Sequence, residues 1–226
     1  MSKVGAVIVA AGSSTRMGGV DKTFAPILGL PLVAHTIDRF ELSPLVHQIV
    51  LVLATDSVAL GQQMVQRRGY SKVTNVCAGG QRRQDSVRFG LELLSSCDWV
   101  MVHDGARPCL DDAMIQRGLE AAAEFGSAVA GVPVKDTIKV VSTDQTVQET
   151  PDRSLLWAAQ TPQVFRYRTL LDAHYASDRD VTDDAAMVES LGNPVKMFLG
   201  SYENIKVTTG DDLIIAETFL NASSTT

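Results

Sequence analysis

The hydrophobic pattern of the chain alternates between short apolar runs and longer segments of helical period. The apolar runs cover residues 4–10, 49–54, 73–78, 99–103 and 128–134. Between them, apolar residues recur every three or four positions, which predicts helices over residues 31–40, 57–68, 85–94 and 111–125. This alternation is typical of an α/β fold with a mostly parallel sheet, covered by helices and joined by right-handed crossovers.

The pattern changes after residue 134. Residues 137–141 and 146–150 are short β-branched runs around Ser142-Thr143-Asp144-Gln145, which predicts a hairpin that protrudes as an arm over about residues 136–160. Helices are predicted over 169–176, 183–191 and 211–220, a strand over 195–199, a short apolar run over 205–207 and a frayed tail over 221–226. With no repeat or long linker, the sequence predicts a single domain over 1–226.

Several residues at the ends of these elements have recognisable local roles. Asp111 and Thr182 are predicted N-caps, and Thr161-Pro162 is predicted to form a turn. The cysteines, Cys77, Cys97 and Cys109, are odd in number and widely spaced, which favours reduced thiols that pack in the interior over disulfides or a zinc site.

The composition narrows the classes of partner. Acidic residues outnumber basic ones by 26 to 20, so the net charge of -6 provides no general attraction to nucleic acid or to an anionic membrane. No apolar run approaches the ~20 residues that span a bilayer, and the first residues do not resemble a secretory signal. We therefore expect a cytoplasmic protein with neither a membrane nor a nucleic-acid partner.

The loop after the first apolar run has the composition of a phosphate-binding loop. Residues 10–14 are Ala-Ala-Gly-Ser-Ser, and such small residues let backbone N–H groups approach phosphate oxygens closely. Arg16 and Lys22 add positive charge nearby. The loop is neither a Walker A motif nor the three-glycine dinucleotide fingerprint, which argues against an oxidoreductase on a dinucleotide fold. On its own, the loop is also compatible with a plain strand-to-helix turn, although the phosphate-binding interpretation is favoured.

Two further segments follow predicted strands. Gly79-Gly80 permits a tight backbone before a helix in which Arg83 and Ser86 can donate hydrogen bonds to a base or a phosphate, although a solvated helix start is an alternative. Asp104 ends the fourth apolar run, where one carboxylate can help to bind Mg²⁺ together with nucleotide phosphates. The adjacent His103 is interpreted as a hydrogen-bonded structural histidine.

Taken together and in this order, six segments resemble the signatures of the 2-C-methyl-D-erythritol 4-phosphate cytidylyltransferases of the non-mevalonate isoprenoid pathway. The similarity extends from Val4 to about Leu220. Each segment is a weak signal alone, and the six in register are a specific one. The segments are Ala-Ala-Gly with Arg-Met-Gly at 10–18, residues 80–87, 103–108, 160–163 and 182–183, and Ile-Lys-Val-Thr at 205–208.

The resemblance implies a Rossmann-like, mostly parallel sheet of the nucleotide-diphospho-sugar transferase type. It also implies transfer of CMP from CTP to 2-C-methyl-D-erythritol 4-phosphate, with release of pyrophosphate. Arg16 and Lys22 would stabilise the pentacoordinate α-phosphate, and Asp104 would contact Mg²⁺. The residues that would position the acceptor are Arg153, Lys206, Thr137, Thr161, Thr182 and Arg107, and those that would bind CTP are Ala10, Ala11, Gly12, Gly80, Gln81, Arg83 and Ser86.

In members of that family the hairpin arm crosses to a second subunit, so the resemblance implies a homodimer in which Arg153 serves the neighbouring site. The sequence departs from the family pattern at two places. Ser14 stands where a second glycine is usual, and Asp21-Lys22-Thr23 replaces Pro-Lys-Gln in a slightly longer loop.

Two other functions remain open from the sequence. One is a cytidylyltransferase for another alditol phosphate, such as ribitol 5-phosphate, because motif spacing does not decide which residues contact the carbon skeleton of the acceptor. The other is a non-catalytic nucleotide-binding module, which would leave Asp104, Arg153 and Lys206 without a role.

Overall fold

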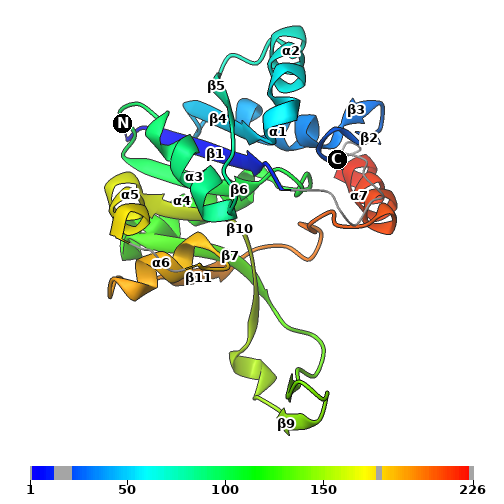
Figure 1. Ribbon diagram of the computed structural model, residues 1–226, viewed down its shortest axis with the longest axis vertical. Helices are drawn as coiled ribbons and strands as arrows, with labels where there is room; N and C mark the ends of the chain where they lie inside the picture. Colours follow the sequence, from blue (N-terminus) through cyan, green and yellow to red (C-terminus); the bar gives the residue numbers. More distant parts are fainter. Residues whose placement is uncertain (1, 13–21, 177–179, 224–226) are drawn as a thin grey trace.

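A seven-stranded sheet lies at the centre of the protein (Figure 1). The computed structural model describes residues 2–12, 22–176 and 180–223. The β10 strand runs antiparallel to both of its neighbours, whereas the other neighbouring strands pair in parallel. The strand order is β11 (Lys196–Leu199), β7 (Ser127–Pro133), β10 (Trp157–Arg166), β6 (Trp99–Asp104), β1 (Val4–Ala10), β4 (Gln48–Leu53) and β5 (Val73–Ala78).

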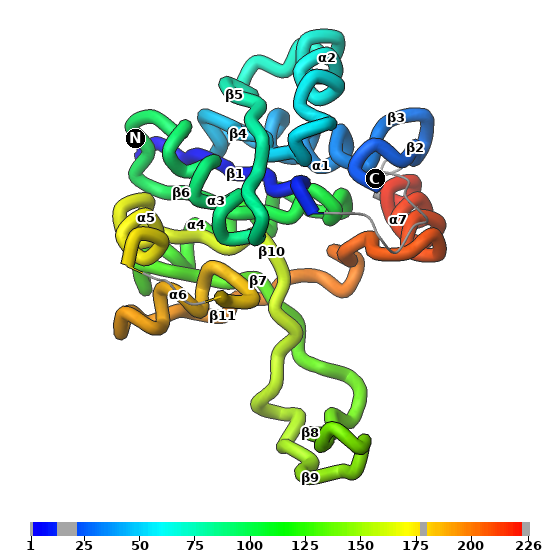
Figure 2. Tube along the Cα trace, in the orientation of Figure 1, coloured from blue at the N-terminus to red at the C-terminus, as the bar shows by residue number. Residues whose placement is uncertain are grey.

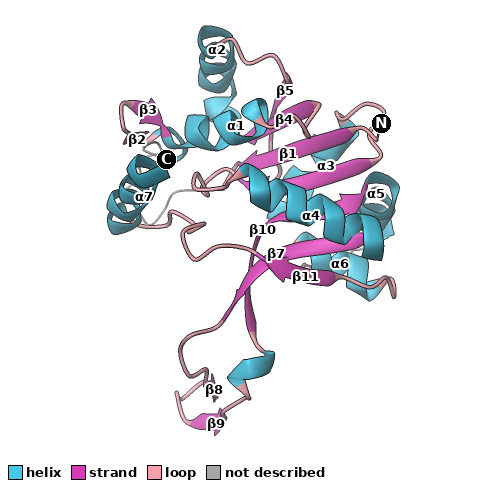
Figure 3. Cartoon of the chain, turned by 180° about the vertical axis from the view of Figure 1, so that it is seen from behind, coloured by secondary structure: helices cyan, strands magenta, loops and turns pink. Residues whose placement is uncertain are grey.

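Helices cover both faces of this sheet. One apolar cluster joins it to α1 (Leu32–Leu42), α2 (Val58–Arg68) and α4 (Asp112–Phe125), and Figure 3 shows α4 lying across that face. A second cluster joins the opposite face to α3 (Arg83–Glu92), α5 (Tyr167–Ala176) and α6 (Asp184–Ser190). The side chains of β1 alternate between the two clusters, since Ala6 and Ile8 belong to the first and Val7 to the second. Burial on both faces explains why β1, β4, β6 and β7 are apolar runs.

The strands β7 and β10 lead out of the sheet into a long arm, visible at the bottom of Figures 1 and 2. The arm carries the hairpin of β8 (Val140–Val141) and β9 (Val147–Glu149), followed by the short helix η4 (Arg153–Leu155). The predicted α/β fold with a protruding hairpin arm is therefore confirmed.

At one side of the molecule, on the right in Figure 1, α7 (Gly210–Ser223) packs against a small hairpin of β2 (Pro26–Ile27) and β3 (Leu30–Pro31). The helix continues to Ser223, into the stretch predicted to be a frayed tail, and residues 224–226 lie outside the described part of the chain. The hairpin of β2 and β3 has no counterpart among the predicted elements. Among the described residues, no helix has the length and apolar character needed to cross a bilayer.

The prediction of a turn at Thr161-Pro162 is wrong, because both residues lie inside the ten-residue strand β10. The pairing of β10 with β7 shifts register between Ala159 and Gln163. A proline lacks the N–H that a ladder needs, and a register irregularity is where a strand tolerates that loss.

The two predicted N-caps had different outcomes. Asp111 caps α4, and its carboxylate accepts a hydrogen bond from Met114 N at 2.6 Å. The cap of α6 is Asp183, which accepts from Ala186 N at 3.0 Å, so the prediction for Thr182 is wrong by one residue. The Asp183 carboxylate accepts the hydrogen bond from the first turn of α6 that the Thr182 hydroxyl was predicted to accept. The Thr182 hydroxyl therefore remains for other contacts.

The three cysteines are free thiols that pack against the apolar clusters, as predicted. Burial raises the pKa of Cys109 to about 11, so this thiol stays protonated at neutral pH.

Gly90 offers a test of how closely α3 packs on the sheet. A Cβ added there would overlap Val7 Cγ1 and lie 3.0 Å from Val52 Cγ2. Overpacking costs about 1–3 kcal/mol, against up to about 1 kcal/mol gained from the better helix propensity of alanine. We expect Gly90→Ala to lower the free energy of unfolding by about 1–2 kcal/mol in urea denaturation.

Gly210→Ala is the matched control. Gly210 begins α7 and has open space where a Cβ would stand, so this variant should be as stable as the wild type. Equal stability of both variants would show that α3 does not pack closely on β1 and β4.

Candidate active site

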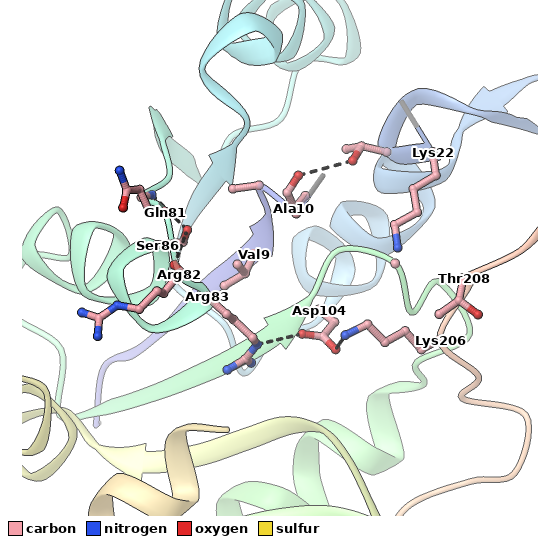
Figure 4. A pocket seen from close by; sticks show the side chains of 15 residues that line it. Val9, Ala10, Lys22, Gln81, Arg82, Arg83, Ser86, Asp104, Lys206 and Thr208 are labelled. Carbon is pink, nitrogen blue, oxygen red and sulfur yellow. Dashed lines mark hydrogen bonds and ion pairs between the residues drawn. The ribbon is translucent and has the colours of Figure 1, made fainter. Parts of the chain in front are cut away.

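The carboxyl ends of β1, β5 and β6 lie at the same edge of the sheet, because these strands run parallel. Strand β1 lies between β4 and β6, where the chain connections diverge to either side, and ligands of open α/β sheets bind at such a position. The loops that follow these strand ends line a cavity of about 540 Å³ (Figure 4). We call this space the larger cavity.

The larger cavity collects residues from distant parts of the sequence. All seven residues predicted to bind CTP line it, together with Lys22, Asp104 and Lys206. Arg82, Thr208, Val9, Thr23 and Ala106 complete the lining. Of these residues, Arg82 and Thr208 had no role predicted from the sequence, although they lie within the 80–87 and 205–208 segments, respectively.

The loop between β5 and α3 is held close to β1. A Cβ on Gly79 would clash with the Ala11 side chain and with Ser86 Oγ, so only glycine fits there. The Ser86 hydroxyl accepts from Gly80 N at 3.1 Å and lies 3.2 Å from the Arg82 carbonyl, to which it donates. Ser86 is almost fully buried, so its observed role is to hold this loop.

Asp104, at the end of β6, is surrounded by cations. Its Oδ2 lies 2.8 Å from Lys206 Nζ and 3.7 Å from Arg107 Nε, and its Oδ1 lies 3.3 Å from Arg83 Nε. Burial alone would raise the pKa of this carboxyl, but the positive charges of Arg83 and Lys206 outweigh burial and hold the pKa well below its usual range. Asp104 is therefore ionised at any physiological pH.

Arg83 connects Asp104 to a second buried carboxylate. Arg83 Nη1 donates to Asp184 Oδ2 at 2.6 Å, and Asp184 Oδ1 lies 3.2 Å from His174 Nε2 without hydrogen-bond geometry. Burial would lower the pKa of Arg83, but the two carboxylates overcome this and raise it. The result is a chain of alternating charge from Lys206 through Asp104 and Arg83 to Asp184.

A smaller cavity of about 260 Å³ adjoins the first. Arg83, Asp104 and Lys206 line both cavities, so this cluster lies at their junction. The smaller cavity also includes Arg107, Thr161 and Thr182, three of the residues predicted to position the acceptor. Its remaining lining residues are Ala159, Gln160, Gln163 and Asp183.

His103 is a buried, hydrogen-bonded structural residue, as predicted. The ring is fully buried, its Nε2 lies 3.0 Å from the Arg107 carbonyl, and its Nδ1 lies 3.1 Å from Thr161 Oγ1. A carbonyl can only accept, so Nε2 carries the proton and Nδ1 accepts from the Thr161 hydroxyl. Thr161 Oγ1 in turn accepts from Asp104 N at 3.0 Å. Burial lowers the pKa of His103 to about 4, so the ring is neutral at pH 7.

Two predicted residues of the smaller cavity also form hydrogen bonds with the backbone of the protein. Thr161 is almost fully buried and holds the backbone of Asp104 through its hydroxyl. Arg107 Nη1 donates to the Asn204 carbonyl at 2.7 Å. Both contacts join the end of β6 to neighbouring segments, which fixes the position of the Asp104 carboxylate.

Of the two predicted catalytic cations, the structure describes only Lys22. Arg16 lies outside the described residues. Lys22 begins the short helix η2 (Lys22–Phe24), lines the larger cavity and donates to the Val207 carbonyl at 3.3 Å. Lys22 and Lys206 point into the same space in Figure 4.

Thr137 and Arg153 lie on the exposed arm and line neither cavity. Arg153 Nη1 donates to the Lys135 carbonyl at 2.9 Å, across the base of the arm. Within one chain, the structure therefore does not bring these two predicted residues to the other members of the site.

Three polar residues at the site were missed by the sequence analysis. Gln163 Nε2 donates to Asp183 Oδ2 at 2.8 Å, and Asn204 Nδ2 donates to the Thr161 carbonyl at 2.8 Å, so both join separate segments around the smaller cavity. Asp184 anchors Arg83. The only signal for them was their place in or directly beside the 160–163, 182–183 and 205–208 segments.

Among the described residues, Asp104 is the one carboxylate that lines both cavities and could hold a Mg²⁺ ion shared with a nucleotide. Mg²⁺ is usually held by one or two carboxylates together with phosphate oxygens and waters, and Asp104 provides one ionised carboxylate facing both cavities. The described residues contain no cluster of three or more His, Cys, Asp or Glu side chains that would form an all-protein metal site.

Comparisons with known proteins show the family to which the chain is similar. The family model described as 2-C-methyl-D-erythritol 4-phosphate cytidylyltransferase matches residues 4–222. A protein of that name from Dehalococcoides mccartyi is 50% identical over 218 residues, which are 96% of each chain. Another from Clostridium acetobutylicum is 43% identical over 224 residues, which are 97% of this chain and 98% of the other.

Solved structures of similar proteins share the fold. The 4-diphosphocytidyl-2C-methyl-D-erythritol synthase of Anaerococcus prevotii matches with a TM-score of 0.85 at 27% identity, covering 97% of this chain and 99% of the other. The 2-C-methyl-D-erythritol 4-phosphate cytidylyltransferase of Francisella tularensis matches with a TM-score of 0.81 at 29% identity, covering 96% and 100%.

The neutral, buried His103 makes stability depend on pH. Its folded pKa of about 4 lies below the ordinary value of 6.5, so the unfolded chain binds the proton first as pH falls. The stabilisation is complete above pH 6.5 and is lost between pH 6.5 and about 4, on the order of 3 kcal/mol at about 1.4 kcal/mol per pKa unit. Urea unfolding at pH 7.5 and 4.5 should show this loss in the wild type.

His103→Gln is the control, because it lacks the titrating ring while the other histidines remain. The variant should lose less stability over the same pH interval than the wild type does. An equal pH dependence of both proteins would show that His103 does not stay neutral in the folded state.

Proposed function

The chain belongs to the 2-C-methyl-D-erythritol 4-phosphate cytidylyltransferase family, and we propose that it catalyses the reaction for which the family is named. In this reaction CMP passes from CTP to 2-C-methyl-D-erythritol 4-phosphate, which gives 4-diphosphocytidyl-2-C-methyl-D-erythritol and pyrophosphate in isoprenoid precursor biosynthesis. The observation that carries the proposal is the junction of two cavities at Asp104, Arg83 and Lys206. One cavity suits a nucleotide and the other a smaller phosphorylated acceptor.

The reaction needs no general base. A phosphate monoester is largely dianionic at neutral pH, since its second pKa is ~6, so its oxygen attacks the α-phosphorus of CTP directly. A new P–O bond forms there, the bond from the α-phosphorus to the β-phosphate oxygen breaks, and pyrophosphate leaves with that oxygen. His103 fits this scheme because both of its ring nitrogens are engaged inside the protein.

The main barrier is the approach of two polyanions, which fixed positive charges lower. We assign Arg16 and Lys22 to the α-phosphate and Lys206 to the acceptor phosphate. Support comes from Lys22 and Lys206, which line the larger cavity together, and from Lys206, which also lines the smaller one. Arg107, Thr161 and Thr182 line the smaller cavity and are proposed to contact the acceptor.

The loops around the larger cavity are proposed to bind CTP through backbone N–H groups and polar side chains. The residues involved are Ala10, Ala11, Gly12, Gly80, Gln81, Arg83 and Ser86. Asp104 would hold Mg²⁺ beside the triphosphate, and the bound ion would supply positive charge to the phosphate oxygens.

We further propose a homodimer in which the arm reaches the site of a second subunit. Arg153 and Thr137 lie on the arm away from both cavities of their own chain, so a neighbouring site would give them a role. The arm also exposes apolar side chains suited to an interface, namely Ile138, Val140, Val141, Val147, Leu155 and Trp157. The cytoplasmic location expected from the sequence stays a prediction.

Pyrophosphate release separates the possible functions. The protein incubated with CTP and Mg²⁺ should release pyrophosphate with 2-C-methyl-D-erythritol 4-phosphate, and much more slowly with ribitol 5-phosphate. Faster release with ribitol 5-phosphate would make another alditol phosphate the acceptor. Binding of CTP without release for either acceptor would favour the non-catalytic module and contradict the proposal.

Lys22→Met should lower kcat by about 10²–10⁴-fold, because fixed cations at a transferring phosphate contribute effects of that size. The matched control is Lys72→Met, since Lys72 Nζ also donates to a backbone carbonyl, that of Ser43, but lines neither cavity. The control should retain wild-type kcat in the same pyrophosphate assay. Wild-type kcat in Lys22→Met would refute the catalytic role of Lys22.

A further inference from the structure

Asp184 is a buried carboxylate that the proposed reaction does not use. It is the first residue of α6, it is fully buried, and it lines neither cavity. A buried charge is costly unless it is paired, and Asp184 is paired with a residue of the site, since its Oδ2 accepts from Arg83 Nη1 at 2.6 Å. Its position therefore bears directly on where the Arg83 guanidinium lies.

Arg83 is held by two carboxylates from different elements. Asp104 at the end of β6 accepts from Nε at 3.3 Å, and Asp184 on α6 accepts from Nη1. A guanidinium is planar, so contacts to two of its nitrogens fix both its position and its orientation. With Asp104 alone, the side chain would regain rotamer freedom at the junction of the two cavities.

The position of Asp184 is in turn fixed by contacts on either side of it. From β10, Gln163 Nε2 donates to Asp183 Oδ2 at 2.8 Å, and Gln163 Oε1 accepts from Ala185 N at 3.2 Å. These two contacts flank Asp184 in sequence and tie the start of α6 to the sheet. Behind Asp184 lies the nearly buried His174 of α5, whose Nε2 is 3.2 Å from Oδ1.

We propose that Asp184 is a positioning residue for cytidylyl transfer, which acts by holding the Arg83 guanidinium at the junction of the nucleotide and acceptor cavities. The inference rests on the proposed function. Arg83 lies between the cavities, where the reacting phosphates would meet, so loss of its orientation should affect turnover more than the binding of either substrate.

The test is a double-mutant cycle with steady-state kinetics for both substrates. Asp184→Asn keeps the size of the side chain and removes its charge. We expect kcat to fall by about 10–100-fold, which is the scale of a small misplacement of a catalytic group, with each KM changed by less than about 3-fold. In an Arg83→Gln background, Asp184→Asn should cause no further loss, because the residue through which Asp184 acts is absent.

Val188→Ala is the matched structural control. Val188 is fully buried in α6, so the variant should lower the thermal stability of this helix and leave kcat unchanged. Wild-type kcat in Asp184→Asn, or an equal loss in both Arg83 backgrounds, would overturn the inference. A wild-type protein without pyrophosphate release would instead overturn the proposed function.

A measurement on the wild-type protein covers the case in which Asp184→Asn does not fold. Nitrogen-15 NMR of the arginine side chains should show resolved, slowly rotating Nη groups for Arg83, assigned by their absence in Arg83→Gln. Rapidly averaged Nη signals for Arg83 would also overturn the inference, because a guanidinium held at two nitrogens cannot rotate freely.

Discussion

The ion-pair cluster around Asp104 is the interaction on which the rest of the site depends. One carboxylate brings Arg83 from α3, Arg107 from the β6 loop and Lys206 from the C-terminal segment to the same point. Burial of these charges is costly, and mutual compensation within the cluster offsets that cost. The cluster also explains why two cavities adjoin rather than one, because its members form the shared wall.

A second layer of neutral contacts keeps this cluster in place. The Arg107 carbonyl sets the tautomer of His103, His103 orients the Thr161 hydroxyl, and that hydroxyl accepts from the backbone N–H of Asp104. Asn204 connects Thr161 to the segment that carries Lys206. Through these hydrogen bonds the residues of the network constrain one another as well as the ion pairs around Asp104.

The arrangement suits chemistry between two phosphorylated substrates. Strand ends provide backbone N–H groups and space, and cations from separate segments provide charge that needs little reorganisation when the substrates meet. The arm is different, because its exposed apolar side chains and Arg153 line neither cavity of their own chain. In the proposed homodimer, a second subunit would cover these apolar side chains and bring Arg153 to a site.

The amino-acid sequence by itself determined the order and type of most elements. Apolar runs and helical periods are local, so β1, β4, β5, β6 and β7 and their helices lie within a few residues of their predicted places. The small and charged residues in the loops after these strands also predicted the lining of the larger cavity, because loop composition can be read directly from the sequence. Parallel strand ends meet at one edge whatever else the fold does.

Only the tertiary structure decided the features that depend on distant partners. Thr161-Pro162 has the local signal of a turn but lies in β10, since pairing with β6 and β7 and a register shift override that signal. The sequence marks the segments around Asp184 and Gln163 but not the roles of these residues, because those roles depend on contacts with residues of other segments. Periodicity and turn chemistry are set by neighbours in the sequence, whereas ion pairs, tautomers and shared cavity walls are set by residues that only folding brings together.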